Sequence, residues 1–134
     1  MTIVSELFRL EDHTAIVAGG AGAIGSAMAA TLLKAGANVI IWSRSERSLG
    51  EAKAKLAPFS DNLDRLYVSR VDTADEQAVA EALTRSPKDF GPVRILINAV
   101  GGNMGKTTFV DTDLDQFSKI IECNLMSGLM VPTK

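Results

Sequence analysis

The sequence has few of the residues that form disulfide, metal or membrane sites. Its 134 residues include one cysteine and one histidine, and a single cysteine permits neither a disulfide framework nor a thiolate metal cluster. No apolar run reaches the roughly 18 residues that a membrane span needs, and the N-terminus lacks the pattern of a signal peptide. We therefore expect a cytoplasmic protein that binds no metal and no membrane.

An excess of charge of one sign is also absent. The 14 Lys and Arg residues nearly balance the 16 Asp and Glu residues, and the formal net charge is −2. No overall field would attract nucleic acid, so any anion must be held by local groups. The hydrophobic content of 46% is ordinary for a soluble globular protein, and we expect one domain spanning residues 1–134.

Short apolar runs alternate with helical patterns along the chain. Strands are predicted at 14–18, 38–42, 65–69 and 93–97. Helices are predicted from Ile24 to a stop at Gly36, from Ser43 to about Ala57, from Thr73 through Leu83, and from about Asp113 to the C-terminus. This alternation predicts an α/β fold, a Rossmann-type doubly wound parallel sheet of about four βα units.

Two details of the helices follow from residue spacing. Ile24, Met28, Leu32 and Ala35 share one face of the first helix, and this spacing is typical of an amphipathic helix. Ser43 with Glu46, and Thr73 with Glu76, have the spacing of a capping box. We therefore expect Ser43 and Thr73 to cap the helices that follow them.

A glycine-rich segment connects the first strand to the first helix. Gly20, Gly22 and Gly25 give the pattern G-x-G-x-x-G, and Gly19, Gly22 and Gly25 give G-x-x-G-x-x-G. Because the glycines leave a strand and open a helix at Ile24, the segment predicts a turn whose free N–H groups bind the pyrophosphate of a dinucleotide. The alternative is a tight turn without a ligand.

The second strand ends without the acidic residue that binds the ribose hydroxyls of NAD. Ser43 and Arg44 stand there instead. A guanidinium is suited to a phosphate group, so the pair, with Arg47 a turn later, favours NADP, with NAD still possible. The alternative is that Arg44 and Arg47 are solvated charges at the start of the helix and Ser43 is only a cap.

Further motifs follow the third and fourth strands: Asp72-Thr73, and Asn98-Ala99-Val100-Gly101. With the glycine turn and Asn124, they make the chain similar to the N-terminal half of the short-chain dehydrogenase/reductase family. The resemblance implies that Asp72 accepts a hydrogen bond from the adenine amino group and that the Thr73 N–H supports the ring. The alternative is that Asp72 only starts a turn before a capped helix. It also implies that Asn98, Ala99 and Gly101 border the cofactor, although Ala99 replaces the second Asn of the family's Asn-Asn-Ala-Gly.

Asn124 lies on one helical stripe with Phe117, Ile121 and Gly128, so we expect its amide on a buried apolar face. The resemblance implies a catalytic part: the matching Asn bends the helix and helps to hold the proton-relay water of the catalytic lysine. The alternative is a structural amide that bridges neighbouring backbone.

The resemblance implies an NADP-preferring oxidoreductase that acts on a carbonyl or alcohol substrate. The family's Ser, Tyr and Lys would lie beyond Lys134, and Tyr67 has no Lys four residues after it. We therefore expect this chain alone to be an inactive cofactor-binding half, and to dimerise through the fourth strand and the last helix.

The loop Gly101-Gly102-Asn103 resembles that of sugar-acid reductases. The glycine pattern keeps open an extended-branch sugar-nucleotide epimerase or dehydratase with bound NAD, and a third alternative is a non-catalytic nucleotide-binding module.

Overall fold

A four-stranded parallel sheet forms the centre of the molecule. The computed structural model describes residues 6–60, 63–102, 104–105 and 107–130. The strands are β1 Thr14–Ala18, β2 Asn38–Ser43, β3 Leu66–Arg70 and β4 Val93–Asn98, in the order β3-β2-β1-β4. The predicted Rossmann-type parallel sheet is confirmed, and each strand lies within one residue of its expected bounds.

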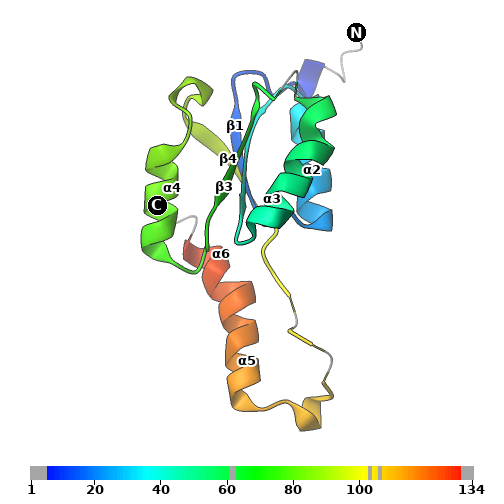
Figure 1. Ribbon diagram of the computed structural model, residues 1–134, viewed down its shortest axis with the longest axis vertical. Helices are drawn as coiled ribbons and strands as arrows, with labels where there is room; N and C mark the ends of the chain where they lie inside the picture. The colour runs from blue at the N-terminus through cyan, green and yellow to red at the C-terminus, as the bar shows by residue number, and fades with distance from the viewer. Residues whose placement is uncertain (1–5, 61–62, 103, 106, 131–134) are drawn as a thin grey trace.

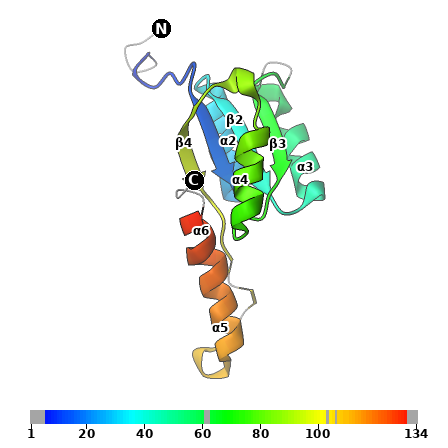
Figure 2. The ribbon, with the colours of Figure 1, turned by 90° about the vertical axis from the view of Figure 1, so that its left-hand side faces the viewer.

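Helices cover both faces of the sheet, as Figures 1 and 2 show. Helices α2 Ala23–Lys34 and α3 Glu46–Leu56 lie on one face, and α4 Glu76–Arg85 lies on the other. Successive strand residues point to opposite faces, so Val17 and Ile41 pack beneath α2 and α3, whereas Ile16 and Ile40 pack on the α4 side. Short 3₁₀ turns span Ala57–Phe59, Lys88–Phe90 and Phe109–Asp111.

The inward face of α2 is not the one that carries Ile24 and Met28. Ile24 is 70% exposed and Met28 41%, and the buried side of the helix carries Gly25, Ser26, Ala29 and Leu33. A Cβ on Gly25 would lie 2.8 Å from the Cα of Gly20. The close approach of the helix to the glycine turn therefore sets which face is buried, and it selects small residues over the larger apolar ones.

The caps of α3 and α4 also differ from the prediction. The side chain of Ser45 accepts a hydrogen bond from Ser48 N at 3.2 Å, and that of Asp75 accepts from the N–H groups of Gln77 and Ala78. Ser43 does not cap α3 because β2 continues through it: Val71 N donates to Ser43 O at 2.9 Å. Thr73 is 4% exposed and faces the pocket described below.

The C-terminal helical segment extends beyond the carboxyl ends of the strands (Figures 1 and 2). It consists of α5 Leu114–Ile121, a π-helical turn Glu122–Met126 and α6 Ser127–Met130. The expected start at Asp113 is confirmed as the cap, since its side chain accepts from Gln116 N at 2.7 Å. The expectation of a buried face was wrong: Phe117 is 54% exposed, Ile121 40%, and Asn124 is exposed. Helical spacing shows which face is apolar, and does not show whether another element covers it.

Candidate nucleotide-binding site

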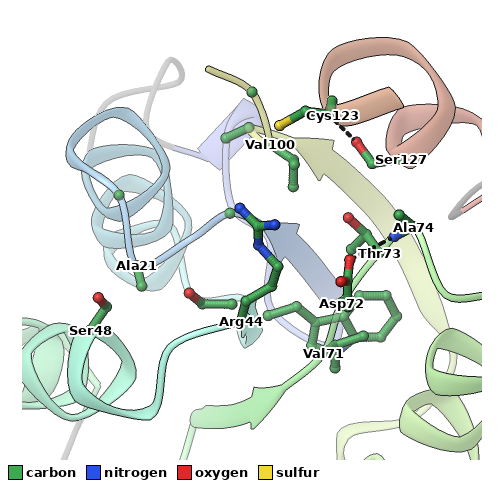
Figure 3. Close-up of a pocket in the computed structure, with 16 residues that line it drawn as sticks. Ala21, Arg44, Ser48, Val71, Asp72, Thr73, Ala74, Val100, Cys123 and Ser127 are labelled. Atoms are coloured by element: carbon green, nitrogen blue, oxygen red, sulfur yellow. Dashed lines mark hydrogen bonds between the residues drawn. The ribbon is translucent and has the colours of Figure 1, made fainter. Parts of the chain in front are cut away.

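An open pocket of about 290 Å³ lies where the carboxyl ends of the four strands meet (Figure 3). This edge is where ligands bind in doubly wound folds. Four separate segments, each following a strand, supply most of the lining, and the C-terminal helical segment supplies the rest. The lining residues are Gly19, Ala21, Gly22, Trp42, Ser43, Arg44, Ser48, Val71, Asp72, Thr73, Ala74, Ala99, Val100, Gly101, Cys123 and Ser127.

The glycine turn forms one wall of the pocket. Gly19 N donates to Trp42 O at 2.9 Å, and Gly22 N donates to Gly19 O at 3.0 Å, so the turn is bound to β2 and folded on itself. Gly19 has a φ of +74°, and a Cβ there would lie 2.6 Å from Ala99 O. Glycine is therefore required for both the conformation and the contact with the β4 end.

The N-terminus of α2 opens toward this turn without a side-chain cap. Its N-cap residue is Gly22, and no side chain of the described residues bonds the first amides there. The first N–H groups of a helix have no partner within the helix and carry its positive dipole end. Together with the missing side chains of Gly19 and Gly22, they form a cradle that fits a phosphate group.

Arg44 is the cation of the pocket. Its side chain extends into the pocket from the end of β2 (Figure 3), and it is exposed. Arg47, the next basic residue, does not line the pocket: its Nε donates to Glu51 Oε1 at 3.0 Å on the outer surface of α3. Ser43 and Ser48 line the pocket beside Arg44 and add two hydroxyl groups to it.

Asp72 and Thr73 lie at the end of β3. One carboxylate oxygen of Asp72 accepts from Ala74 N at 3.0 Å, which fixes the turn before α4. The alternative role of Asp72 as a turn former is therefore present in the structure. It does not exclude a ligand, because an ionised carboxylate has a second oxygen and further lone pairs to accept with.

The segment after β4 forms the wall of the pocket next to the glycine turn. Ala99 N donates to Ala18 O at 2.8 Å, which extends the pairing of β4 with β1. Asn98 Oδ1 accepts from Val100 N at 3.1 Å and so shapes the turn rather than lining the pocket. Ala99 and Gly101 face the pocket with their neighbour Val100.

Asn124 acts as a bridge between two segments. Its Oδ1 accepts from Gly102 N at 3.1 Å, and its Nδ2 donates to Gly102 O at 2.6 Å and to Ile120 O at 2.8 Å. The backbone-bridging interpretation therefore describes its contacts. The amide holds the loop after β4 against the π-helical turn, next to Cys123 and Ser127, which line the pocket.

The structure thus brings together most, though not all, of the expected site residues. The pocket includes Gly19, Gly22, Ser43, Arg44, Asp72, Thr73, Ala99 and Gly101. It does not include Gly20, Ile24, Gly25, Asn98 and Asn124, and Asn103 lies outside the described residues. Among these, Gly20 and Gly25 serve the packing of the turn, since a Cβ on Gly20 would lie 2.8 Å from the Ile41 side chain.

Sequence reasoning missed several residues of the pocket. Ser48 lies one helical turn beyond the capping Ser45, and this position could have been found from the correct cap. Cys123 and Ser127 enter the pocket only through the tertiary placement of the C-terminal segment. Among the described residues, no helix is long and apolar enough to cross a membrane, and no group of three metal-ligating side chains comes together.

The chain is similar to known proteins over most of its length. The family model described as short chain dehydrogenase matches residues 13–133. A short chain dehydrogenase/reductase of Macrophomina phaseolina is 31% identical over 90% of this chain and 68% of its own length. A Sphingomonas protein named 2-dehydro-3-deoxy-L-rhamnonate dehydrogenase (NAD(+)) is 30% identical over 87% of this chain and 44% of its own length.

Solved structures share the fold. The RhlG protein of Pseudomonas aeruginosa, in a complex with NADP, superposes with a TM-score of 0.80 at 24% identity, over 94% of this chain and 47% of that one. The chain thus spans about half the length of that protein, and 38% to 51% of several other curated relatives.

Proposed function

Because this chain belongs to the short chain dehydrogenase family, we propose that its pocket binds NADP(H) in preference to NAD(H). The whole protein would be an oxidoreductase that transfers hydride between the nicotinamide and a carbonyl or alcohol substrate. The observation that carries the proposal is the convergence of the glycine turn, Arg44 and Asp72 on one pocket. The family match favours this function over a sugar-nucleotide epimerase and over a non-catalytic module.

The cofactor preference rests on the residues of this chain, because similar proteins include one named for NAD and one solved with NADP. The end of β2 carries no carboxylate at the position where an acidic residue binds the ribose hydroxyls of NAD, so that position would not repel a 2′-phosphate. The guanidinium of Arg44 has no hydrogen bond or ion pair with the described residues, so its donors are available to a phosphate. Ser43 would add a hydroxyl donor, whereas the Ser48 hydroxyl donates to Ser45 Oγ at 3.2 Å in this structure.

Each part of the dinucleotide has a matching group in the pocket. The uncapped N-terminus of α2 would bind the pyrophosphate. The free oxygen of Asp72 would accept from the adenine amino group, and Thr73 would support the ring through its backbone N–H. Ala99 and Gly101 would border the nicotinamide half, where the bridging Asn124 holds the loop.

The bound cofactor supplies the hydride, and the described residues position it. Their contribution is to orient the nucleotide, to hold its phosphates, and to fix the loop after β4 by way of Asn124. Asn124 touches backbone rather than a reacting group in this structure, so we assign it a positioning role. The residues that exchange a proton with the substrate would lie outside this chain, as would those that select the substrate.

Binding measurements test the cofactor preference. Trp42 is the one tryptophan of the sequence and lines the pocket, so its fluorescence should report binding. We expect NADPH to bind more tightly than NADH, and Arg44→Ala to weaken NADPH about 10- to 100-fold, since hydrogen bonds to charged groups contribute about 1.5–3 kcal/mol. In Arg44→Ala, the affinity for NADH should stay within about threefold of that of the parent chain.

Arg47→Ala is the matched control, because it removes an equal charge three residues away whose guanidinium is paired with Glu51. This variant should leave both affinities within about threefold of the parent, as expected for an exposed charge outside the pocket. Equal affinities of the parent for NADPH and NADH would contradict the preference. Equal effects of the two substitutions would contradict the assignment to Arg44.

A further inference from the structure

At the end of β2 and β3, a hydrogen bond from the Arg70 side chain extends the main-chain pairing of the two strands by one residue. Ser43 is the last residue of β2 and pairs with Arg70, the last residue of β3. Val71 N donates to Ser43 O at 2.9 Å, which is the final main-chain bond. One residue beyond the end of β2, the carbonyl of Arg44 accepts from the side-chain Nε of Arg70 at 3.1 Å.

This bond restrains the residue whose side chain enters the pocket. Holding a long arginine side chain in one conformation costs rotamer entropy, and no described side chain binds the guanidinium of Arg44. Its orientation therefore depends on its backbone. Arg70 fixes the carbonyl of Arg44 on one side, and the Ser45 cap fixes the start of α3 on the other.

We propose that Arg70 is a positioning residue for the 2′-phosphate of NADP: it acts through the main chain of Arg44 and sets the direction of the phosphate-binding guanidinium. This inference rests on the proposed NADP preference and deepens it. Arg70 does not line the pocket. Its effect on the phosphate therefore passes through Arg44, and it should disappear when the Arg44 side chain is removed.

The test compares two nucleotides that differ only in the 2′-phosphate, namely 2′,5′-ADP and 5′-ADP. Dissociation constants would be measured by Trp42 fluorescence for the parent chain, Arg70→Met, Arg44→Ala and the double variant. Methionine keeps an unbranched side chain of similar reach and removes the donor. Loss of one hydrogen bond predicts that Arg70→Met weakens 2′,5′-ADP about 3- to 10-fold and leaves 5′-ADP within about twofold.

The double variant separates positioning from direct binding. If Arg70 acts through Arg44, adding Arg70→Met to Arg44→Ala should cause no further loss of 2′,5′-ADP affinity. Arg85→Met controls for the loss of one exposed cation, because Arg85 is paired with Glu81 on α4 and does not line the pocket. It should change neither affinity. Urea unfolding of each variant shows whether the fold is kept. Arg70→Lys is a second variant, which retains the positive charge but places its ammonium one bond farther along the side chain than the Nε of arginine.

Each outcome decides the inference. A loss of 2′,5′-ADP affinity in Arg70→Met that remains in the Arg44→Ala background would overturn positioning and make Arg70 a direct ligand. If the parent prefers 2′,5′-ADP, and the ratio of the two affinities is unchanged in Arg70→Met and Arg70→Lys, the proposed role of Arg70 is overturned and the NADP preference stands. A parent that binds both nucleotides equally would overturn the NADP preference itself, and the role of Arg70 with it.

Discussion

The three glycines of the G-x-x-G-x-x-G pattern have different physical tasks. Gly19 combines a φ of +74° with close contact to the Ala99 backbone. Gly25 has an ordinary helical position, but a Cβ there would meet the backbone of Gly19 and Gly20, which cannot move without opening the turn. At Gly22 an added Cβ would approach only Gly19 O, at 3.4 Å. The middle glycine is thus the one that packing tolerates losing.

This difference predicts unequal effects of adding one methyl group. Gly25→Ala should lower the free energy of unfolding by about 1–3 kcal/mol, the usual cost of overpacking. Gly22→Ala should stay within about 0.5 kcal/mol of the parent, because the weaker cap is offset by the lower entropy of the unfolded chain. Urea unfolding monitored by circular dichroism measures both. Equal losses would show that the turn rearranges freely around either methyl group.

Among individual residues, the glycines, Arg44, Asp72 and Thr73 could be predicted to meet, because parallel strands bring their carboxyl ends to one edge. Arg70 could not, since its contact with Arg44 depends on the register of β2 against β3. The same limit applies to Cys123, whose place in the pocket depends on the tertiary docking of its helical segment.

At the scale of elements, the caps show where spacing alone is insufficient. Ser43 and Ser45 both precede α3, and the capping-box spacing to Glu46 predicted Ser43 as the cap. The choice falls on Ser45 because β2 pairs with β3 through Ser43, a long-range interaction. Likewise, Asp75 rather than Thr73 caps α4, and Thr73 is left to face the pocket. The presence of each strand and helix was predictable from the sequence, whereas the residue at which β2 ends depends on its pairing with the neighbouring strand β3.

Helix α3 contains a glycine that has no packing task. Gly50 is exposed, and an added Cβ would meet nothing within 4 Å. Gly50→Ala should therefore raise the free energy of unfolding by about 0.5–1 kcal/mol, the difference in helix propensity between the two residues. The reciprocal change Ala54→Gly, at an exposed position of the same helix, should lower it by a similar amount. Thermal unfolding of both variants checks the prediction, and a loss of stability in Gly50→Ala would contradict it.

The π-helical turn depends on Asn124 for its connection to the loop after β4. Asn124→Ala removes three hydrogen bonds, two of them to Gly102. We expect faster amide hydrogen exchange at Gly102. The free energy of unfolding should fall by only about 1 kcal/mol, because the site is exposed and water replaces part of the lost hydrogen bonding. Ser118→Ala, on the exposed surface of α5, is the control and should leave exchange at Gly102 unchanged. Unchanged exchange in Asn124→Ala would show that the loop is held by other contacts.

At the scale of the whole molecule, the apolar surface is unevenly distributed. The C-terminal helical segment, which projects beyond the sheet (Figure 1), carries the exposed side chains of Phe117, Ile121, Leu125 and Met126. A groove beside Ala74 is lined by the first two of these and by Met126. In addition, β4 is an edge of the described sheet, with Val93 and Leu96 partly exposed. Apolar patches and open strand edges of this kind favour association.

We therefore predict that the chain dimerises, and that Phe117 contributes to the interface. Sedimentation velocity should show a dimer that dissociates on dilution, and Phe117→Glu should shift the equilibrium toward monomer by placing a charge in the apolar contact. Leu7→Glu is the matched control: Leu7 is 75% exposed, and the first described segment of the chain, to which it belongs, lies at the opposite end of the molecule from α5 (Figure 1). A clean monomer for the parent would contradict the prediction. Equal shifts in both variants would show that association depends on net charge instead of this surface, because each substitution adds the same charge at opposite ends.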